Sequence, residues 1–150
     1  MKKNITKDII LNACLEKQEE LIAGFERRVN DTRTDAYARQ ESASQSENRT
    51  PGKIELLSKF QTELEFAKLE MEHLKTLDAA IVNTIVQPGA VVVTNLRTFF
   101  IGVSSEKIDI DGNEVFGIST KAPIYAVMQG LEKGGSFEYN NTAYTIKNVY

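Results

Sequence analysis

Acidic side chains gather in the polar stretch between residues 30 and 52, at Asp31, Asp35, Glu41 and Glu47. Their carboxylates are the groups in this sequence best suited to deliver negative charge to a reaction. Exposed turns are also rich in Asp and Glu, so their spacing alone is explained by a solvated surface without any function. Whether they act together depends on the elements that hold them.

Other chemistry-bearing residues are few. The single histidine, His73, cannot build a zinc site, and nothing orients it toward the single cysteine, Cys14. The glycines at 130, 134 and 135 lack the Lys-Ser/Thr ending of a phosphate-binding loop. We therefore expect a protein without a metal or cofactor of its own. A lone cysteine fits a reducing compartment, which predicts a cytoplasmic protein.

Charge and hydropathy exclude several classes of partner. The net charge is −3, of which residues 1–88 carry −2 and residues 89–150 carry −1, so neither half has the basic excess of a nucleic-acid-binding protein. Nucleic acid would be reached only through a protein partner. The sequence has no run of about 18 apolar residues, so we expect no membrane span.

Two stretches before Pro88 show the apolar spacing of coiled-coil helices. The first seam is Leu11, Leu15, Gln18, Ile22, Phe25 and Val29, and the second is Leu57, Phe60, Leu64, Ala67, Met71 and Leu74. Neither helix can bury its seam alone. We predict that they pair as an intramolecular antiparallel hairpin over residues 1–86 and that the protein is a monomer, with a dimeric coiled coil between chains as the alternative.

The connector between the two seams leaves two alternatives. The first helix either continues to about Ser44, with a turn from Gln45 to Pro51, or stops at Val29 and leaves a polar loop of about 20 residues, a length that suggests function or disorder. Thr50 is a plausible N-cap and Pro51 fits the first turn of the second helix. In both cases the tip, defined here as residues 31–51, contains the four acidic residues.

After Gly89 the pattern changes to short strands, which we place at 90–94, 97–103, 115–119, 136–139 and 144–149. Asp111-Gly112 and Gly134-Gly135 indicate turns, and a short helix is expected between Pro123 and Gly130. Phe99 and Phe100 must face opposite sides of a strand, which could leave one of them exposed. The fold class is therefore α+β, a helical hairpin followed by a small β-rich domain with one short helix at 87–150.

The C-terminal segment resembles the Gre-type transcript cleavage factors of bacterial RNA polymerase. The matches are Ile118-Ser119, Ala122-Pro123, the helix to Gly130, Gly134, and Tyr144, Ile146 and Val149, while PGAVVVT resembles the first strand of the same domain. The resemblance implies an N-terminal coiled-coil hairpin and an FKBP-like C-terminal domain. This chain has Ala122-Pro123 where the family commonly has Ser-Pro, and Gly134-Gly135 where it has Gly-Asp. The scattered aromatic residues do not favour prolyl isomerase activity.

The resemblance also implies a function. In the family, the C-terminal domain docks on RNA polymerase and the hairpin enters the secondary channel. There its tip acids help the polymerase to hold a second Mg²⁺ and to orient a water molecule that hydrolyses backtracked RNA. The chain would thus be an accessory factor and not itself an enzyme, and Mg²⁺ would be held jointly with the polymerase.

The tip departs from the acidic motif of the cleaving members. Asp31 and Asp35 are four residues apart instead of three, with Arg33 between them. The segment 40–50 could equally be the tip, which makes Glu41 and Glu47 the first candidates and Asp31 and Asp35 the second. The irregular motif leaves open a channel regulator that does not cleave, and a coiled-coil adaptor unrelated to polymerase is a third possibility.

Docking in the family uses the exposed surface of the C-terminal domain near the short helix and its neighbouring turn. The corresponding residues here are Lys121, Pro123, Ile124 and Tyr125. Ile124 and Tyr125 could instead pack beneath the sheet.

Overall fold

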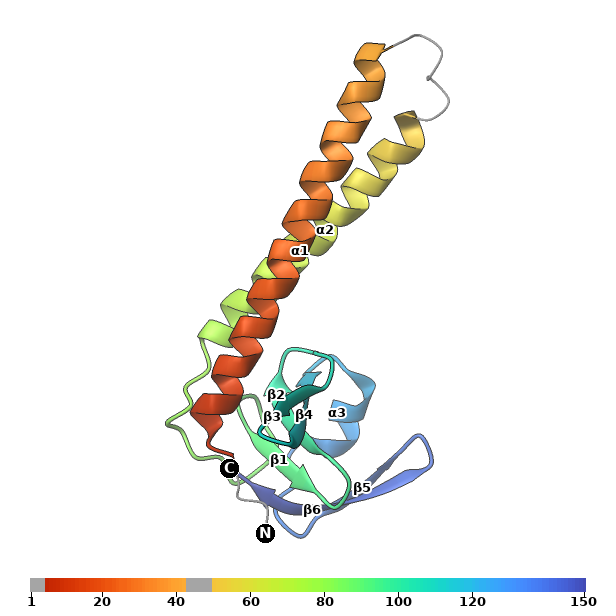
Figure 1. The fold of residues 1–150 in the computed structure, drawn as a ribbon. Coiled ribbons are helices and arrows are strands. Elements are labelled where there is room, and N and C mark those ends of the chain that lie inside the picture. The colour runs from red at the N-terminus through yellow and green to blue at the C-terminus, as the bar shows by residue number, and fades with distance from the viewer. Residues whose placement is uncertain (1–4, 43–49) are drawn as a thin grey trace. The chain divides into compact units, whose positions relative to one another are not determined.

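The computed structural model describes residues 5–42 and 50–150, with side chains described outside 36–51. Two helices come first, α1 (Lys7–Ser42) and α2 (Thr50–Lys75). Figure 1 shows them side by side as a hairpin. The predicted hairpin is therefore confirmed within one chain. The helix ending at Val29 with a long loop is wrong, because α1 continues to Ser42 and α2 begins at Thr50 with Pro51 in its first turn.

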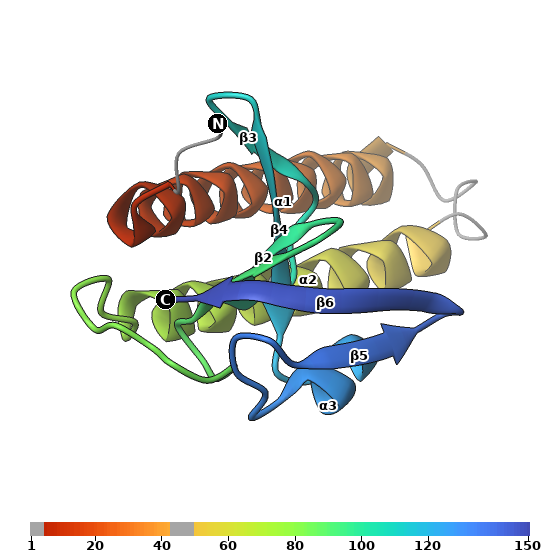
Figure 2. The same cartoon turned by 90° about the horizontal axis from the view of Figure 1, so that it is seen from below.

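A six-stranded sheet with one short helix follows. Its strands are β1 (Val91–Thr94), β2 (Thr98–Gly102), β3 (Ile108–Ile110), β4 (Asn113–Ser119), β5 (Ser136–Tyr139) and β6 (Thr142–Val149), and the helix is α3 (Pro123–Met128). The strand order is β3-β4-β2-β1-β6-β5, with β2 and β4 parallel and the other neighbours antiparallel. Figure 2 shows β5 beside β6 and α3 at the β5 side. The predicted α+β class is confirmed.

Two turns of the sheet use backbone that few residues adopt. Asp111 and Gly112 join β3 to β4 with φ of 50° and 83°, and Asn140 and Asn141 join β5 to β6 with φ of 51° and 60°. Positive φ at both central residues is the geometry of a two-residue hairpin turn, and Asn, Asp and Gly tolerate it best. The Asp-Gly turn was predicted, whereas the Asn-Asn turn and the three-residue strand β3 were not.

The chain divides into two compact units. The hairpin unit is Gln18–Met71, and the sheet unit combines Met1–Lys17 with Glu72–Tyr150. This division differs from the boundary at 86/87 that we expected, because the first turns of α1 and the end of α2 pack in a core of the sheet unit. Ile10, Cys14 and Leu74 are buried there with Phe100 and Val115.

The sheet has a buried cluster on each face. One contains Val92, Phe99 and Ile118 with Tyr125 and Met128 of α3, and the other contains Val91 and Phe100 with the helix ends just described. Alternate side chains of one strand thus enter different cores. The expectation that Phe99 or Phe100 could be exposed is wrong, because both faces are covered and both rings are buried.

Candidate functional site

The hairpin unit is held by the two predicted seams. Val29, Ala67 and Met71 are buried, and the other apolar seam positions of this unit are half-buried. Gln18 is 4% exposed and its Nε2 donates a hydrogen bond of 2.8 Å to the carbonyl oxygen of Ala67. A buried amide with a partner avoids the cost of an unsatisfied polar group. It also fixes which residues of α1 and α2 lie opposite each other.

A second pair of contacts lies further along the same helices. The Arg28 guanidinium lies 5.6 Å from the ring centre of Phe25 on its own helix and 6.0 Å from that of Phe60 on α2. Both distances are within the range of a cation–π interaction. Arg28 therefore covers the edge of the seam and keeps its charge in water.

The first pair of candidate acids lies on α1 with unequal surroundings. Asp31 is exposed. Asp35, one turn further on, accepts a 2.5 Å ion-paired hydrogen bond from Nζ of Lys53 at the start of α2. The side chains of Lys53 and Asp35 are 32% and 42% exposed, so water screens this pair only in part. Of the two carboxylates, Asp31 therefore presents its charge to solvent, whereas that of Asp35 is already balanced by a cation.

The second pair of candidate acids is only partly described. Glu41 belongs to the last turn of α1, but its side chain is among those left undescribed. Glu47 lies outside the described residues. Both residues stay candidates on the strength of the sequence alone. The structure brings Asp31 and Asp35 onto one helix.

Lys53 is the residue at this end of the hairpin that sequence reasoning missed. The sequence did contain a signal for it. The second seam alternates steps of three and four residues, and the position four residues before Leu57 is Lys53. A cation at a seam position near the end of a hairpin predicts an anion on the facing helix. Asp35 supplies that anion.

No metal site is formed by the part of the chain that the structure describes. Its His, Cys, Asp and Glu residues make no group of three or more that could hold a metal ion. The described carboxylates thus do not fit a self-sufficient Mg²⁺ site, which normally uses oxygen ligands in octahedral geometry. His73 is exposed on α2. Cys14 is buried, and burial raises the pKa of its thiol to about 11, so it is a packed and unreactive residue.

The four candidate docking residues surround the start of α3. Lys121 and Pro123 are exposed, and Pro123 is in the first turn of the helix. Ile124 is half-buried against the cluster that contains Phe99. Tyr125 is 5% exposed and belongs to that cluster. Tyr125 therefore packs beneath the sheet, and a partner could meet Lys121, Pro123 and the outer part of Ile124.

Comparison with solved structures finds similar chains, and two of them are described here. No protein-family model matches the chain, and no curated protein matches it. The crystal structure of GreA factor homolog 1 (Gfh1) of Thermus thermophilus is similar at 12% identity and a TM-score of 0.35, covering 91% of this chain and 94% of that one. A second structure, of the transcription factor Gfh1, is similar at 13% identity and a TM-score of 0.34, covering 91% and 92%.

At these TM-scores the likeness does not establish a family, and a function must be argued from the chain's own residues. Within the described ranges, no helix is long and apolar enough to cross a membrane.

Proposed function

We propose that the chain is an elongation factor that docks on RNA polymerase and inserts its hairpin into the secondary channel, where it stimulates cleavage of backtracked RNA. The observation that carries the proposal is the order of elements in one chain. An antiparallel hairpin with two matched seams precedes a small sheet whose last strand contains Tyr144, Ile146 and Val149. These are the elements and the closing motif that the Gre-type resemblance implies.

Each unit has its own part in this proposal. The exposed surface at Lys121 and Pro123 would meet the polymerase. The tip would bring carboxylates to the active centre, with Glu41 and Glu47 as the first candidates and Asp31 as the exposed member of the second pair. Two carboxylates on one chain hold Mg²⁺ weakly, so the polymerase would supply the remaining ligands and perform the hydrolysis. The factor would act as a cytoplasmic monomer and reach RNA only through the polymerase.

The ion pair of Asp35 with Lys53 favours a second candidate function. A carboxylate that already faces an ammonium group attracts Mg²⁺ less strongly than a free one. If Asp35 corresponds to the second acid of the family motif, the hairpin would occupy the channel without promoting cleavage. The chain would then be a regulator of the same build.

A binding assay followed by a cleavage assay tests both functions. The full chain is mixed with purified core polymerase and then with stalled, backtracked complexes. We expect binding together with faster RNA cleavage, and Glu41→Ala plus Glu47→Ala should abolish the stimulation while binding is kept. The matched control is Glu55→Ala plus Glu65→Ala, which removes two exposed acids of α2 away from the tip.

The outcomes separate the alternatives. Binding with no stimulation, or with inhibition, would show the non-cleaving regulator. Cleavage that is unchanged in the Glu41 and Glu47 double variant would exclude these two residues as the acting acids and leave Asp31 and Asp35 as the candidates. Absence of binding to the polymerase would overturn both functions and leave a coiled-coil adaptor for an unrelated protein.

A further inference from the structure

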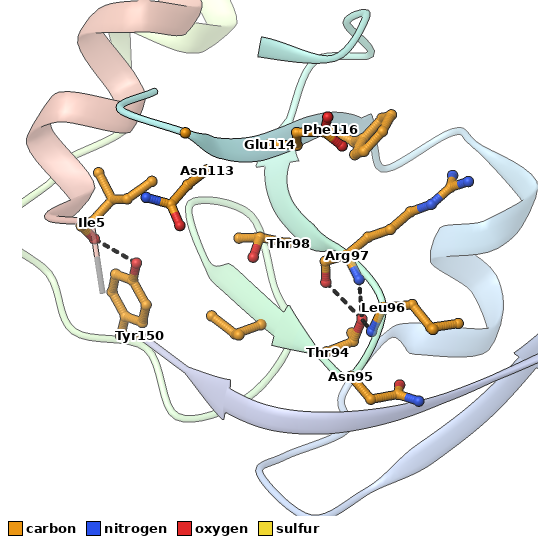
Figure 3. A pocket seen from close by; sticks show the side chains of 12 residues that line it. Ile5, Thr94, Asn95, Leu96, Arg97, Thr98, Asn113, Glu114, Phe116 and Tyr150 are labelled. Atoms are coloured by element: carbon orange, nitrogen blue, oxygen red, sulfur yellow. Dashed lines mark hydrogen bonds between the residues drawn. The ribbon is translucent and has the colours of Figure 1, made fainter. Parts of the chain in front are cut away.

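A cavity of about 460 Å³ lies within the sheet unit, where β1 ends and β2 and β4 begin. Its walls are the turn between β1 and β2, the start of β4, and the side chains of Ile5 and Tyr150 (Figure 3). This volume falls within the usual range for small-molecule sites, about 300–1,000 Å³. None of the candidate docking residues lines it. The cavity is therefore separate from the surfaces used in the proposed function.

Arg97 supplies the cationic group of this cavity. Its guanidinium lies 4.9 Å from the centre of the Phe116 ring, which also lines the cavity. No ion pair to Arg97 is found among the described residues. A guanidinium has five N–H donors, and stacking on a ring leaves its edge free for hydrogen bonds. The group is thus oriented by an aromatic face and open to an anion.

The backbone that carries Arg97 is fixed by one hydroxyl group. Oγ1 of Thr94 donates to the carbonyl oxygen of Arg97 at 2.6 Å and accepts hydrogen bonds from the N–H groups of Leu96 at 3.2 Å and Arg97 at 2.9 Å. The same turn is tied to β6, because Oδ1 of Asn95 accepts a 2.8 Å bond from the N–H of Thr145. A turn held at several points presents its side chains without a further ordering cost, which favours binding.

The other walls add little negative charge. Glu114 is the carboxylate of the lining, and Nζ of Lys107 lies 3.1 Å from it. The hydroxyl of Tyr150 donates to the carbonyl oxygen of Ile5. Burial raises the pKa of this phenol, so Tyr150 is neutral at ordinary pH. Thr98 and Asn113 contribute neutral polar side chains. Arg97 is therefore the charged lining residue for which the described part of the chain supplies no ion pair.

We propose that this cavity binds a small molecule with a carboxylate or phosphate group, which accepts hydrogen bonds from the guanidinium of Arg97. Figure 3 shows the Arg97 side chain extending toward Phe116, whose ring provides apolar surface for the rest of the molecule. The proposal does not depend on any interaction with polymerase.

Titration of the full chain by two-dimensional ¹⁵N–¹H NMR tests this site, with inorganic phosphate and succinate as probes. Sodium chloride at the same ionic strength is the reference. We expect saturable shifts of the amide signals of residues 94–98 and 113–116 with at least one probe. Saturation by phosphate alone would assign a phosphate ligand, and saturation by succinate alone would assign a carboxylate ligand.

Three variants make the test specific. Arg97→Gln should raise the dissociation constant of the probe at least about tenfold, since hydrogen bonds to charged groups are the strong ones. Glu114→Gln should lower that constant at least about twofold, because a negative charge of the wall is removed. Arg33→Gln, which removes an exposed arginine of the hairpin unit, should leave it unchanged. The proposal is overturned if neither probe gives saturable shifts, or if Arg97→Gln binds as tightly as the original chain.

Discussion

Nε2 of Gln18 donates a 2.8 Å hydrogen bond to the carbonyl oxygen of Ala67, inside an otherwise apolar seam. A single polar pair in such a seam specifies which turns of two helices face each other, at some cost in stability. Together with the Asp35–Lys53 pair, it defines the antiparallel register of the hairpin unit. Each contact joins one residue of α1 to one residue of α2. The two partners are 49 residues apart in the Gln18–Ala67 contact and 18 residues apart in the Asp35–Lys53 contact, which is nearer the tip.

Gln18→Glu should lower the free energy of unfolding by about 2–3 kcal/mol, because a buried carboxylate would face a carbonyl oxygen and lose the amide donor. Urea denaturation followed by circular dichroism measures the loss. Glu19→Gln, an exposed change of the same chemistry in the reverse direction, is the control and should have little effect. Equal midpoints for Gln18→Glu and the unchanged chain would contradict a role for this hydrogen bond.

Gly117→Ala should destabilise the sheet unit by about 1–3 kcal/mol. A Cβ on Gly117 would lie 2.5 Å from both Oγ of Ser105 and the carbonyl oxygen of Val103, so a strand or a loop would have to move. Gly24→Ala is the matched control. Its new Cβ would meet nothing closer than 3.9 Å inside α1, and it should stabilise the chain by about 0.5–1 kcal/mol.

Opposite signs for the two substitutions in thermal melts would support this account of Gly117. A Gly117→Ala variant as stable as the original chain would show that the loop around Ser105 yields easily.

How much of the fold could be predicted from the sequence depends on what each kind of sequence pattern determines. The 4-3 spacing of Leu11 through Val29 predicted the buried face of α1, because a helix period fixes which side chains share a face. It did not reveal that Ile10 is also fully buried, since Ile10 belongs to a cluster that includes side chains of the sheet. A periodic pattern identifies a face but not the element that covers it.

The same limit explains the errors in the β-rich part. Alternation correctly placed Phe99 and Phe100 on opposite faces, but it could not show that helix ends bury the second face. Strand β3 has only three residues, with exposed Asp109 between two isoleucines, so its signal was too short to recognise. For the candidate site, the acids could be listed from the sequence, whereas the pairing of Asp35 with Lys53 needed the register of the hairpin.

Stability should depend on pH through Lys7. Lys7 is 7% exposed and its Nζ donates a 2.6 Å hydrogen bond to the carbonyl oxygen of Ile81. Burial lowers its pKa, and attraction to Asp78 offsets part of that effect. In the window between the lowered folded value and the usual lysine value of about 10.4, the unfolded chain binds more protons than the folded one. Stability contributed by Lys7 therefore rises with pH through that window.

The measurement compares the original chain with Lys7→Met in urea from neutral pH to about pH 10.4. The unfolding free energy of the original chain minus that of the variant should increase as pH rises. Lys147→Met, at an exposed lysine of β6, is the control and should show no such trend. A difference that is constant across the range, or that shifts in the opposite direction, would contradict the lowered pKa of Lys7.

The ion pair between Asp35 and Lys53 should contribute little stability, because both side chains are partly in water. A double-mutant cycle with Asp35→Asn and Lys53→Gln should give a coupling energy below about 1 kcal/mol, decreasing as salt is added. A coupling of several kcal/mol that does not respond to salt would show a pair shielded from water. The same Lys53→Gln variant removes the positive charge beside Asp35, so it should raise cleavage stimulation if this acid acts in the polymerase.

Neighbouring residues at the start of α3 should respond differently to substitution, because one faces solvent and the other the core. Pro123→Asp places a charge on the exposed first turn and should weaken binding to core polymerase at least about tenfold without changing the melting temperature. Tyr125→Ala should instead cost about 3–5 kcal/mol of stability, since its ring is buried with Met128. Ala143→Asp, at an exposed position of β6, controls for an added charge on the sheet unit. Normal binding by Pro123→Asp would remove this turn from the docking surface, while an unchanged melting temperature for Tyr125→Ala would show that the cluster does not need the tyrosine.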